Sequence, residues 1–165
     1  MSNDLVQKKV KDLIEKLGLK SGNEYLKEAL FVAEYKSELQ EGSKNNYQST
    51  EMEGPNRRLE NIGDRFLKLV LAEEMYCRCH TVQEMDDFTQ KNESNHNLYD
   101  LKLVKASDGY CTIDGAPCEN KKGDSKKMIS SLTEAIIGAM YLDELERNRT
   151  TDFAREFIIE KIIRY

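Results

Sequence analysis

The chain has 165 residues, 33% of them charged, and no apolar run approaches the length needed to span a membrane. This length and composition predict one intracellular domain, residues 1–165, cytoplasmic or nuclear and without a membrane partner. The formal net charge of −5 at pH 7 argues against a protein that binds nucleic acid by surface charge alone.

Hydrophobic residues recur at helical spacing along most of the chain. The pattern predicts seven helices, at residues 5–17, 23–37, 55–79, 82–92, 95–106, 125–143 and 151–163. Asp4 is expected to cap the first helix, Gly18 to end it, and Ser94 or Asn95 to cap the fifth. The polar stretch 38–55 predicts a long exposed loop, and the turn-rich stretch 107–124 predicts irregular backbone. No stretch alternates as a strand would, so we expect an all-α domain of about seven helices.

Four cysteines raise the question of a zinc site. They are Cys77, Cys79, Cys111 and Cys118, and His80 follows the second of them. The pairs are separated by one and six residues, whereas structural zinc sites usually pair cysteines two residues apart. The spacing therefore favours ordinary reduced thiols over zinc ligands.

Three acidic residues lie within two otherwise apolar helical stretches. Glu60 and Asp64 are four residues apart, and Ser131 and Glu134 are three apart, so each pair shares one face of its helix. A carboxylate among apolar side chains is costly unless it is paired or binds a metal. If the two helices pack together, three carboxylates and a hydroxyl group converge on one point.

Glycines in the middle of both stretches favour such packing. Gly63 and Gly138 each cost a helix about 1 kcal/mol relative to alanine, and a close approach of two helices is the natural compensation. A cluster of oxygen ligands without His or Cys suits Mg²⁺, with Mn²⁺ as a substitute. The alternative is that the acids form salt bridges, and the candidate partners are Arg57, Arg58, Arg65 and Lys127.

Both acidic stretches resemble motifs of a known family. The sequence LExxGD at residues 59–64 is similar to the signature of the ribonuclease III endonuclease domain. The sequence EAIIGAxYLD at 134–143 is similar to the second acidic motif of that family, and NxNL at 95–98 falls where the family has a short motif that opens a helix. The resemblance covers most of residues 25–163, with the motifs in the family's order.

The resemblance implies a fold, a reaction and a set of site residues. We expect a ribonuclease III-type helical domain that forms a homodimer and cleaves double-stranded RNA, leaving staggered ends with a 5′ phosphate and a 3′ hydroxyl. Glu60, Asp64 and Glu134 would bind Mg²⁺, with Ser131 beside them. Lys127 and Asn95 would contact phosphate, although a solvated lysine and a helix cap are equally good interpretations of these two residues.

The chain also departs from the family pattern. Ser131 replaces an expected Asp, Arg57 an expected acidic residue and Asn61 an expected aromatic residue, and the segment 31–37 lacks the family's early His-x-Ser motif. A catalytically inactive, ribonuclease III-like dimerisation or RNA-binding subunit is therefore the alternative to a nuclease. An unrelated all-α interaction protein would require both acidic motifs to match by accident. No double-stranded RNA-binding domain is expected within the chain, which predicts either a minimal endonuclease domain or a fragment of a longer protein.

Overall fold

The computed structural model describes residues 2–19, 23–31, 55–105, 108–109, 111–113, 116–118 and 126–163. The helices are α1 (Ser2–Leu17), α2 (Asn23–Leu30), α3 (Pro55–Tyr76), α4 (Val82–Glu93), α5 (Asn95–Asp100), α6 (Lys126–Asn148) and α7 (Asp152–Lys161). Two short strands, β1 (Cys111–Ile113) and β2 (Ala116–Cys118), pair as an antiparallel hairpin. The prediction of an all-α fold is confirmed, with this hairpin as a small addition. The prediction of a single domain over residues 1–165 stays a prediction.

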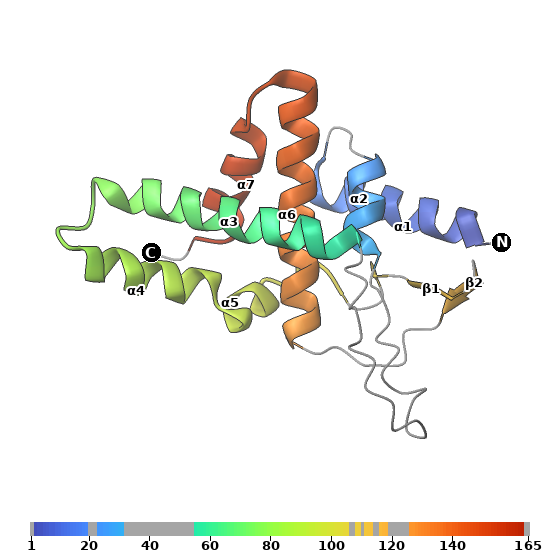
Figure 1. Cartoon of the computed structure of the whole chain (residues 1–165), viewed down its shortest axis with the longest axis horizontal. Coiled ribbons are helices and arrows are strands. Elements are labelled where there is room, and N and C mark those ends of the chain that lie inside the picture. Colours follow the sequence, from blue (N-terminus) through green and yellow to red (C-terminus); the bar gives the residue numbers. More distant parts are fainter. Residues whose placement is uncertain are drawn as a thin grey trace, which may run out of the picture.

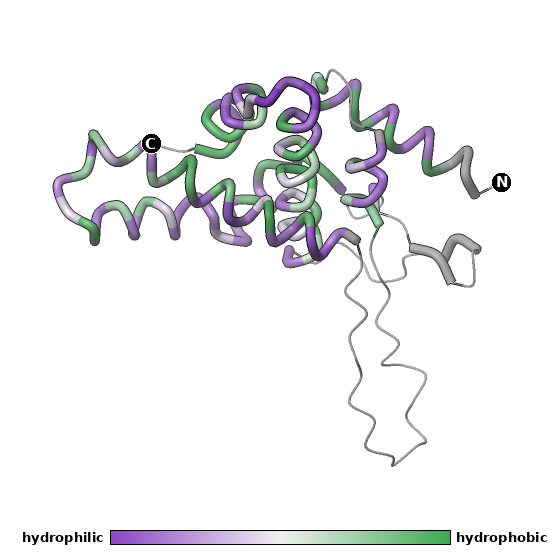
Figure 2. The backbone as a smooth tube through the Cα atoms, turned by 45° about the horizontal axis from the view of Figure 1, so that its top comes forward, coloured by the Kyte–Doolittle hydropathy of each residue, from purple (hydrophilic) through white to green (hydrophobic). Residues whose placement is uncertain are grey.

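Helix α6 forms the centre of the molecule, and α3 lies across it (Figure 1). Helices α2, α5 and α7 also pack against α6. Hydrophobic and hydrophilic residues alternate along α1 and α3 (Figure 2), as expected for helices with one face toward a core. Fully buried side chains from several helices fill this core, among them Leu30, Leu67, Leu71, Leu132, Ile137 and Ile158.

Gly63 of α3 and Gly138 of α6 lie where the two helices cross. A Cβ atom on Gly63 would collide with the carbonyl oxygen of Glu134, and one on Gly138 would collide with the carbonyl oxygen of Leu59. The backbones of α3 and α6 are therefore in direct contact. This confirms the close helix approach that was predicted from the two glycines. This contact brings the acidic segments of α3 and α6 side by side.

The helix boundaries differ from the predicted ones at several points. Helix α1 begins at Ser2, so Asp4 lies inside it and is not its cap, whereas Gly18 ends it with a positive φ of 67°. Helix α3 ends at Tyr76 rather than near residue 79, and α2 ends at Leu30. Residues 32–37 of the second predicted helix, and residues 38–54 of the predicted loop, lie outside the described residues.

Helix α5 is shorter than predicted because the chain turns away at its end. Ser94 caps its beginning, as predicted, and Leu101 ends it. Lys102 then adopts a left-handed backbone with φ of 50°, and the buried Val104 carries the following segment back to the core. The apolar residues of this segment resembled a helix face in the sequence but belong to non-helical backbone.

Helix α6 ends at Asn148, five residues later than predicted, and this end supports α7. The carboxylate of Glu144 accepts hydrogen bonds from the backbone N–H groups of Phe153 (3.0 Å) and Ala154 (3.0 Å). The backbone N–H groups in the first turn of α7 thus find their acceptor on α6, because the side chain of the N-cap residue Thr151 makes no such hydrogen bond. The prediction of irregular backbone over 107–124 was wrong for the hairpin, whose three-residue strands are too short to show alternation.

Cys77 and Cys79, which follow α3, are free cysteines. Of Cys111 and Cys118 the structure describes the backbone, where the two residues face each other in the hairpin register. None of the described helices combines the length and the hydropathy that a membrane crossing requires.

Candidate active site

Glu60 and Asp64 lie one turn apart on the part of α3 that crosses α6. Arg57 Nη1 lies 2.8 Å from Glu60 Oε2 and 3.0 Å from Oε1, which forms an ion pair within the first turns of α3. Arg65 donates to the side chain of Asn61 instead, at 3.0 Å. The salt-bridge alternative is therefore right for Arg57 and wrong for Arg65.

Ser131 connects the two acidic segments directly. Its hydroxyl group on α6 donates to Glu60 Oε1 on α3 at 2.9 Å. Ser131 and Glu60 are therefore in contact across the two helices, as the sequence predicted. Ser131 contributes a hydrogen bond at this position but no negative charge.

Glu134 lies one turn further along α6, on the same face as Ser131. Its pKa is raised to about 8, first by burial and then by the negative charges of Asp64 and Glu60. The ammonium group of Lys68 acts in the opposite direction. The three acids singled out in the sequence are therefore close enough to interact, and they destabilise the ionised form of Glu134.

Glu60, Asp64 and Glu134 form an acidic cluster at the helix crossing. Lys68 and Glu93 also belong to this cluster, and the sequence analysis did not predict either of them. Lys68 Nζ contacts Asp64 Oδ1 at 2.9 Å and lies 3.6 Å from Glu93 Oε2. The hydrogen bond to Asp64 raises the pKa of Lys68, while partial burial opposes this. The spacing of four residues between Asp64 and Lys68 was a usable signal. Glu93 had none, because it ends α4 and reaches α3 only through the tertiary fold.

The cluster has the donor chemistry that a divalent cation requires. All its anionic groups are carboxylates, and Glu93 Oε2 is buried without a hydrogen bond from the part of the chain that the structure describes. Burial is the main cause of the raised pKa of Glu134, and a bound cation would relieve the second cause, repulsion from Asp64 and Glu60. Among the described residues, however, no group of three His, Cys, Asp or Glu side chains is arranged to hold a metal ion. Metal binding by Glu60, Asp64 and Glu134 thus stays a prediction.

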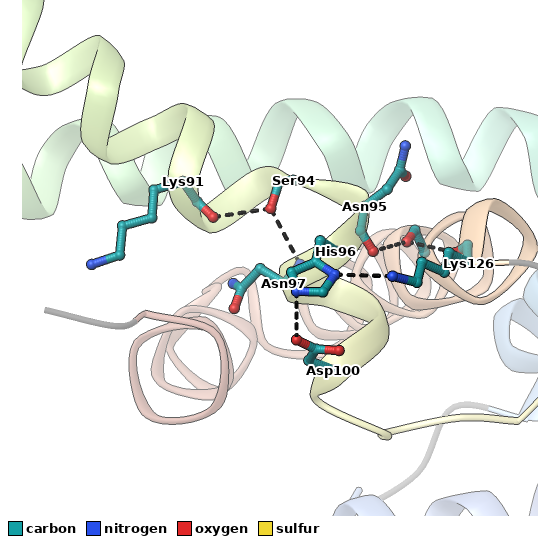
Figure 3. A network of polar contacts seen from close by, with 8 residues as sticks. Lys91, Ser94, Asn95, His96, Asn97, Asp100 and Lys126 are labelled. Atoms are coloured by element: carbon teal, nitrogen blue, oxygen red, sulfur yellow. Dashed lines mark hydrogen bonds and ion pairs between the residues drawn. The ribbon is translucent and has the colours of Figure 1, made fainter.

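Asn95 begins α5 and packs by its backbone against the start of α6. Its carbonyl oxygen accepts a hydrogen bond from the hydroxyl group of Ser130 at 2.9 Å. The Asn95 side chain points away from the neighbouring contact of His96 with Lys126 (Figure 3), whose nitrogen atoms are 3.2 Å apart. Asn95 is exposed, and its cap interpretation is wrong because Ser94 provides the cap. A role in phosphate contact is untested.

Asn97 fixes the position of α5 from within the core. Its buried side-chain amide donates to the carbonyl oxygens of Asn92 at 2.8 Å and of Ile162 at 3.3 Å. Ile162, the second acceptor, is the residue that ends α7. The amide therefore joins α5 to the end of α7.

Lys127 is exposed in the first turn of α6. Seven residues separate it from Glu134, which places the two on the same helix face and about 10 Å apart along the axis. Lys127 therefore lies beside the acidic cluster and outside it.

Comparison with known proteins identifies the family of the chain. A family model described as Ribonuclease-III-like matches residues 44–165, a range that includes all the residues of the cluster. The chain belongs to the Ribonuclease-III-like family. The match confirms the resemblance drawn from the two acidic motifs.

Curated relatives of this Ribonuclease-III-like chain include bacterial proteins named Ribonuclease 3. That of Vibrio parahaemolyticus serotype O3:K6 is 33% identical over 100 residues, which cover 58% of this chain and 44% of the relative. That of Vibrio cholerae serotype O1 is 34% identical over 98 residues, with the same two coverages. This chain thus spans less than half the length of these relatives. No solved structure matches it.

Proposed function

We propose that this chain is a metal-dependent endoribonuclease that hydrolyses double-stranded RNA as a homodimer, leaving a 5′ phosphate and a 3′ hydroxyl. One observation carries the proposal: Glu60 and Asp64 of one helix and Glu134 of another interact across a crossing built from two glycines. The family membership of the chain and the name of its relatives support the same reaction.

In this proposal Glu60, Asp64 and Glu134 hold Mg²⁺, for which Mn²⁺ can substitute. When bound, the divalent ion would supply activation of water and neutralisation of charge at the phosphodiester. Glu134 must give up its proton to serve as a ligand, because its pKa of about 8 keeps it largely protonated at neutral pH. Ser131 holds the Glu60 carboxylate toward α6 through its hydrogen bond.

Lys127 and Asn95 are the proposed contacts to the RNA backbone. Both are exposed and lie at the starts of α6 and α5, which pack against each other. Lysine and asparagine side chains that contact phosphate fix the position of a nucleic acid without reading its sequence. Because the whole chain carries a net charge of −5, such local contacts must provide the attraction that the molecule as a whole lacks.

Cleavage of an end-labelled RNA duplex at low salt tests the proposal. The wild-type protein and the Glu134→Gln variant are compared with Mg²⁺, with Mn²⁺ and with a chelator. We expect metal-dependent cutting by the wild type and a loss of at least a hundredfold in the variant, whose amide is a much weaker ligand. Glu160→Gln changes an exposed carboxylate of α7 and should retain full activity.

The alternative is a catalytically inactive subunit that dimerises or binds RNA. Two observations favour it: Arg57 already neutralises Glu60, and Ser131 adds no charge where the family has an Asp. Intact RNA in the presence of folded, dimeric wild-type protein would support this alternative and contradict the nuclease.

A further inference from the structure

Arg57 is the unusual group in the acidic cluster. It stands where the family pattern has an acidic residue, and its guanidinium group contacts both oxygens of Glu60. The Arg57 side chain is 41% exposed, whereas that of Glu60 is 18% exposed. The arginine therefore covers the more buried carboxylate from the solvent side.

The remaining contact of Glu60 leaves little of the carboxylate free. Oε1 accepts from the Ser131 hydroxyl at 2.9 Å and from Arg57 at 3.0 Å, and Oε2 accepts from Arg57 at 2.8 Å. A cation that takes Glu60 as a ligand must share these oxygens with the guanidinium group or displace it. The positive charge of Arg57 also repels any divalent ion that enters beside it.

We propose that Arg57 competes with a divalent cation for the Glu60 carboxylate and thereby sets the metal concentration at which the cluster fills. The inference rests on the proposed metal site, and it concerns only residues of this chain. Arg57 is thus a positioning residue: without metal it holds Glu60 in place of the ion, and with metal it gives way.

The size of the effect follows from the exposure of the pair. Ion pairs at the protein surface are weak, and this one has one partner well exposed and one partly buried. Its removal should therefore tighten cation binding by roughly threefold to tenfold. A larger change is not expected, because the other carboxylates of the cluster remain as they are.

Arg58 provides a matched control on the same helix. It carries the same charge and is exposed, but one residue along a helix rotates it by about 100° away from the face of Arg57. Arg58→Gln thus changes the net charge of the molecule as Arg57→Gln does, without removing the contact to Glu60.

Titration calorimetry with Mn²⁺ and no RNA tests the inference on the wild type, Arg57→Gln and Arg58→Gln. We expect the Mn²⁺ dissociation constant to fall threefold to tenfold in Arg57→Gln and to stay within twofold in Arg58→Gln. Thermal unfolding in chelator verifies that all three proteins are folded. The inference is overturned by equal shifts in the two variants, by no shift in Arg57→Gln, or by the absence of Mn²⁺ binding in every protein.

The outcome is separable from that of the cleavage experiment. If Arg57→Gln tightens Mn²⁺ binding while no variant cuts RNA, the inference holds and the nuclease proposal fails. If the wild type cuts RNA and Arg57→Gln leaves the Mn²⁺ affinity unchanged, the nuclease proposal is supported and the proposed competition by Arg57 is contradicted.

Discussion

At the scale of single residues, Glu134 shows what a half-buried acid does in a helix that is otherwise part of the core. Its neighbours Ala135, Ile136 and Ile137 are buried, and the carboxylates of α3 have the largest effect on its pKa after burial. Both conditions favour the protonated form of the Glu134 carboxyl group at neutral pH.

The raised pKa of Glu134 predicts a stability that falls with pH. A carboxyl group of ordinary pKa, 4.5, ionises in the unfolded chain while the folded protein keeps its proton up to about pH 8. Between these values the folded state binds more protons, so the free energy of unfolding decreases by at most about 1.4 kcal/mol per pH unit. The stabilisation is complete below pH 4.5 and lost above about pH 8.

Urea unfolding in chelator at pH 5.0 and pH 8.5 measures this effect, with Glu134→Gln as the comparison. Glutamine resembles the protonated acid, so the two proteins should be similarly stable at the lower pH and the variant more stable at the higher. A difference that is the same at both pH values would contradict the assigned pKa. Glu160→Gln controls for the general effect of removing one carboxylate.

At the scale of elements, the α3–α6 crossing was the most predictable part of the site. Acids at helical spacing and a glycine in each helix were visible in the sequence, and the structure brings them together. Glu93 could not be found in the same way, because its contact with Lys68 depends on how α4 folds back beside α3. The spacing of residues in the sequence shows which side chains share one face of a helix. It does not show which other element packs against that face, because this depends on the tertiary fold.

The crossing also predicts a large effect of a small substitution. Gly138→Ala improves helix propensity, yet its methyl group would collide with the Leu59 carbonyl oxygen, which belongs to backbone and cannot rotate away. We expect the variant to lose about 3 kcal/mol or more of stability in urea unfolding. Asn148→Ala, at the exposed end of α6, should change stability by no more than about 0.5 kcal/mol. Similar midpoints for the two variants would show that the helices can separate at little cost.

At the scale of the whole molecule, the proposed homodimer requires an apolar surface outside the core. Leu69 and Tyr76 of α3 are 51% and 76% exposed, and their spacing of seven residues puts them on one face of the helix. We expect Leu69→Lys to convert a dimer to a monomer, as measured by light scattering at micromolar concentrations.

Val82→Lys is the control for this variant. Val82 is 74% exposed at the start of α4, and the substitution adds the same charge on a different element. Dimerisation should survive it. A Leu69→Lys variant that still dimerises would show that the subunit contact lies elsewhere. A wild-type protein that is monomeric at all concentrations would contradict the homodimer itself.

The buried amide of Asn97 connects two helices that are far apart in the sequence. One of its two acceptors is the carbonyl group of Ile162, at the end of α7. When the last turn of α7 frays, the amide loses that acceptor inside the core, and α5 loses part of what holds it. We therefore expect a disturbance of the end of α7 to loosen α5, and with it the proposed phosphate contact of Asn95, without a change in any acidic residue.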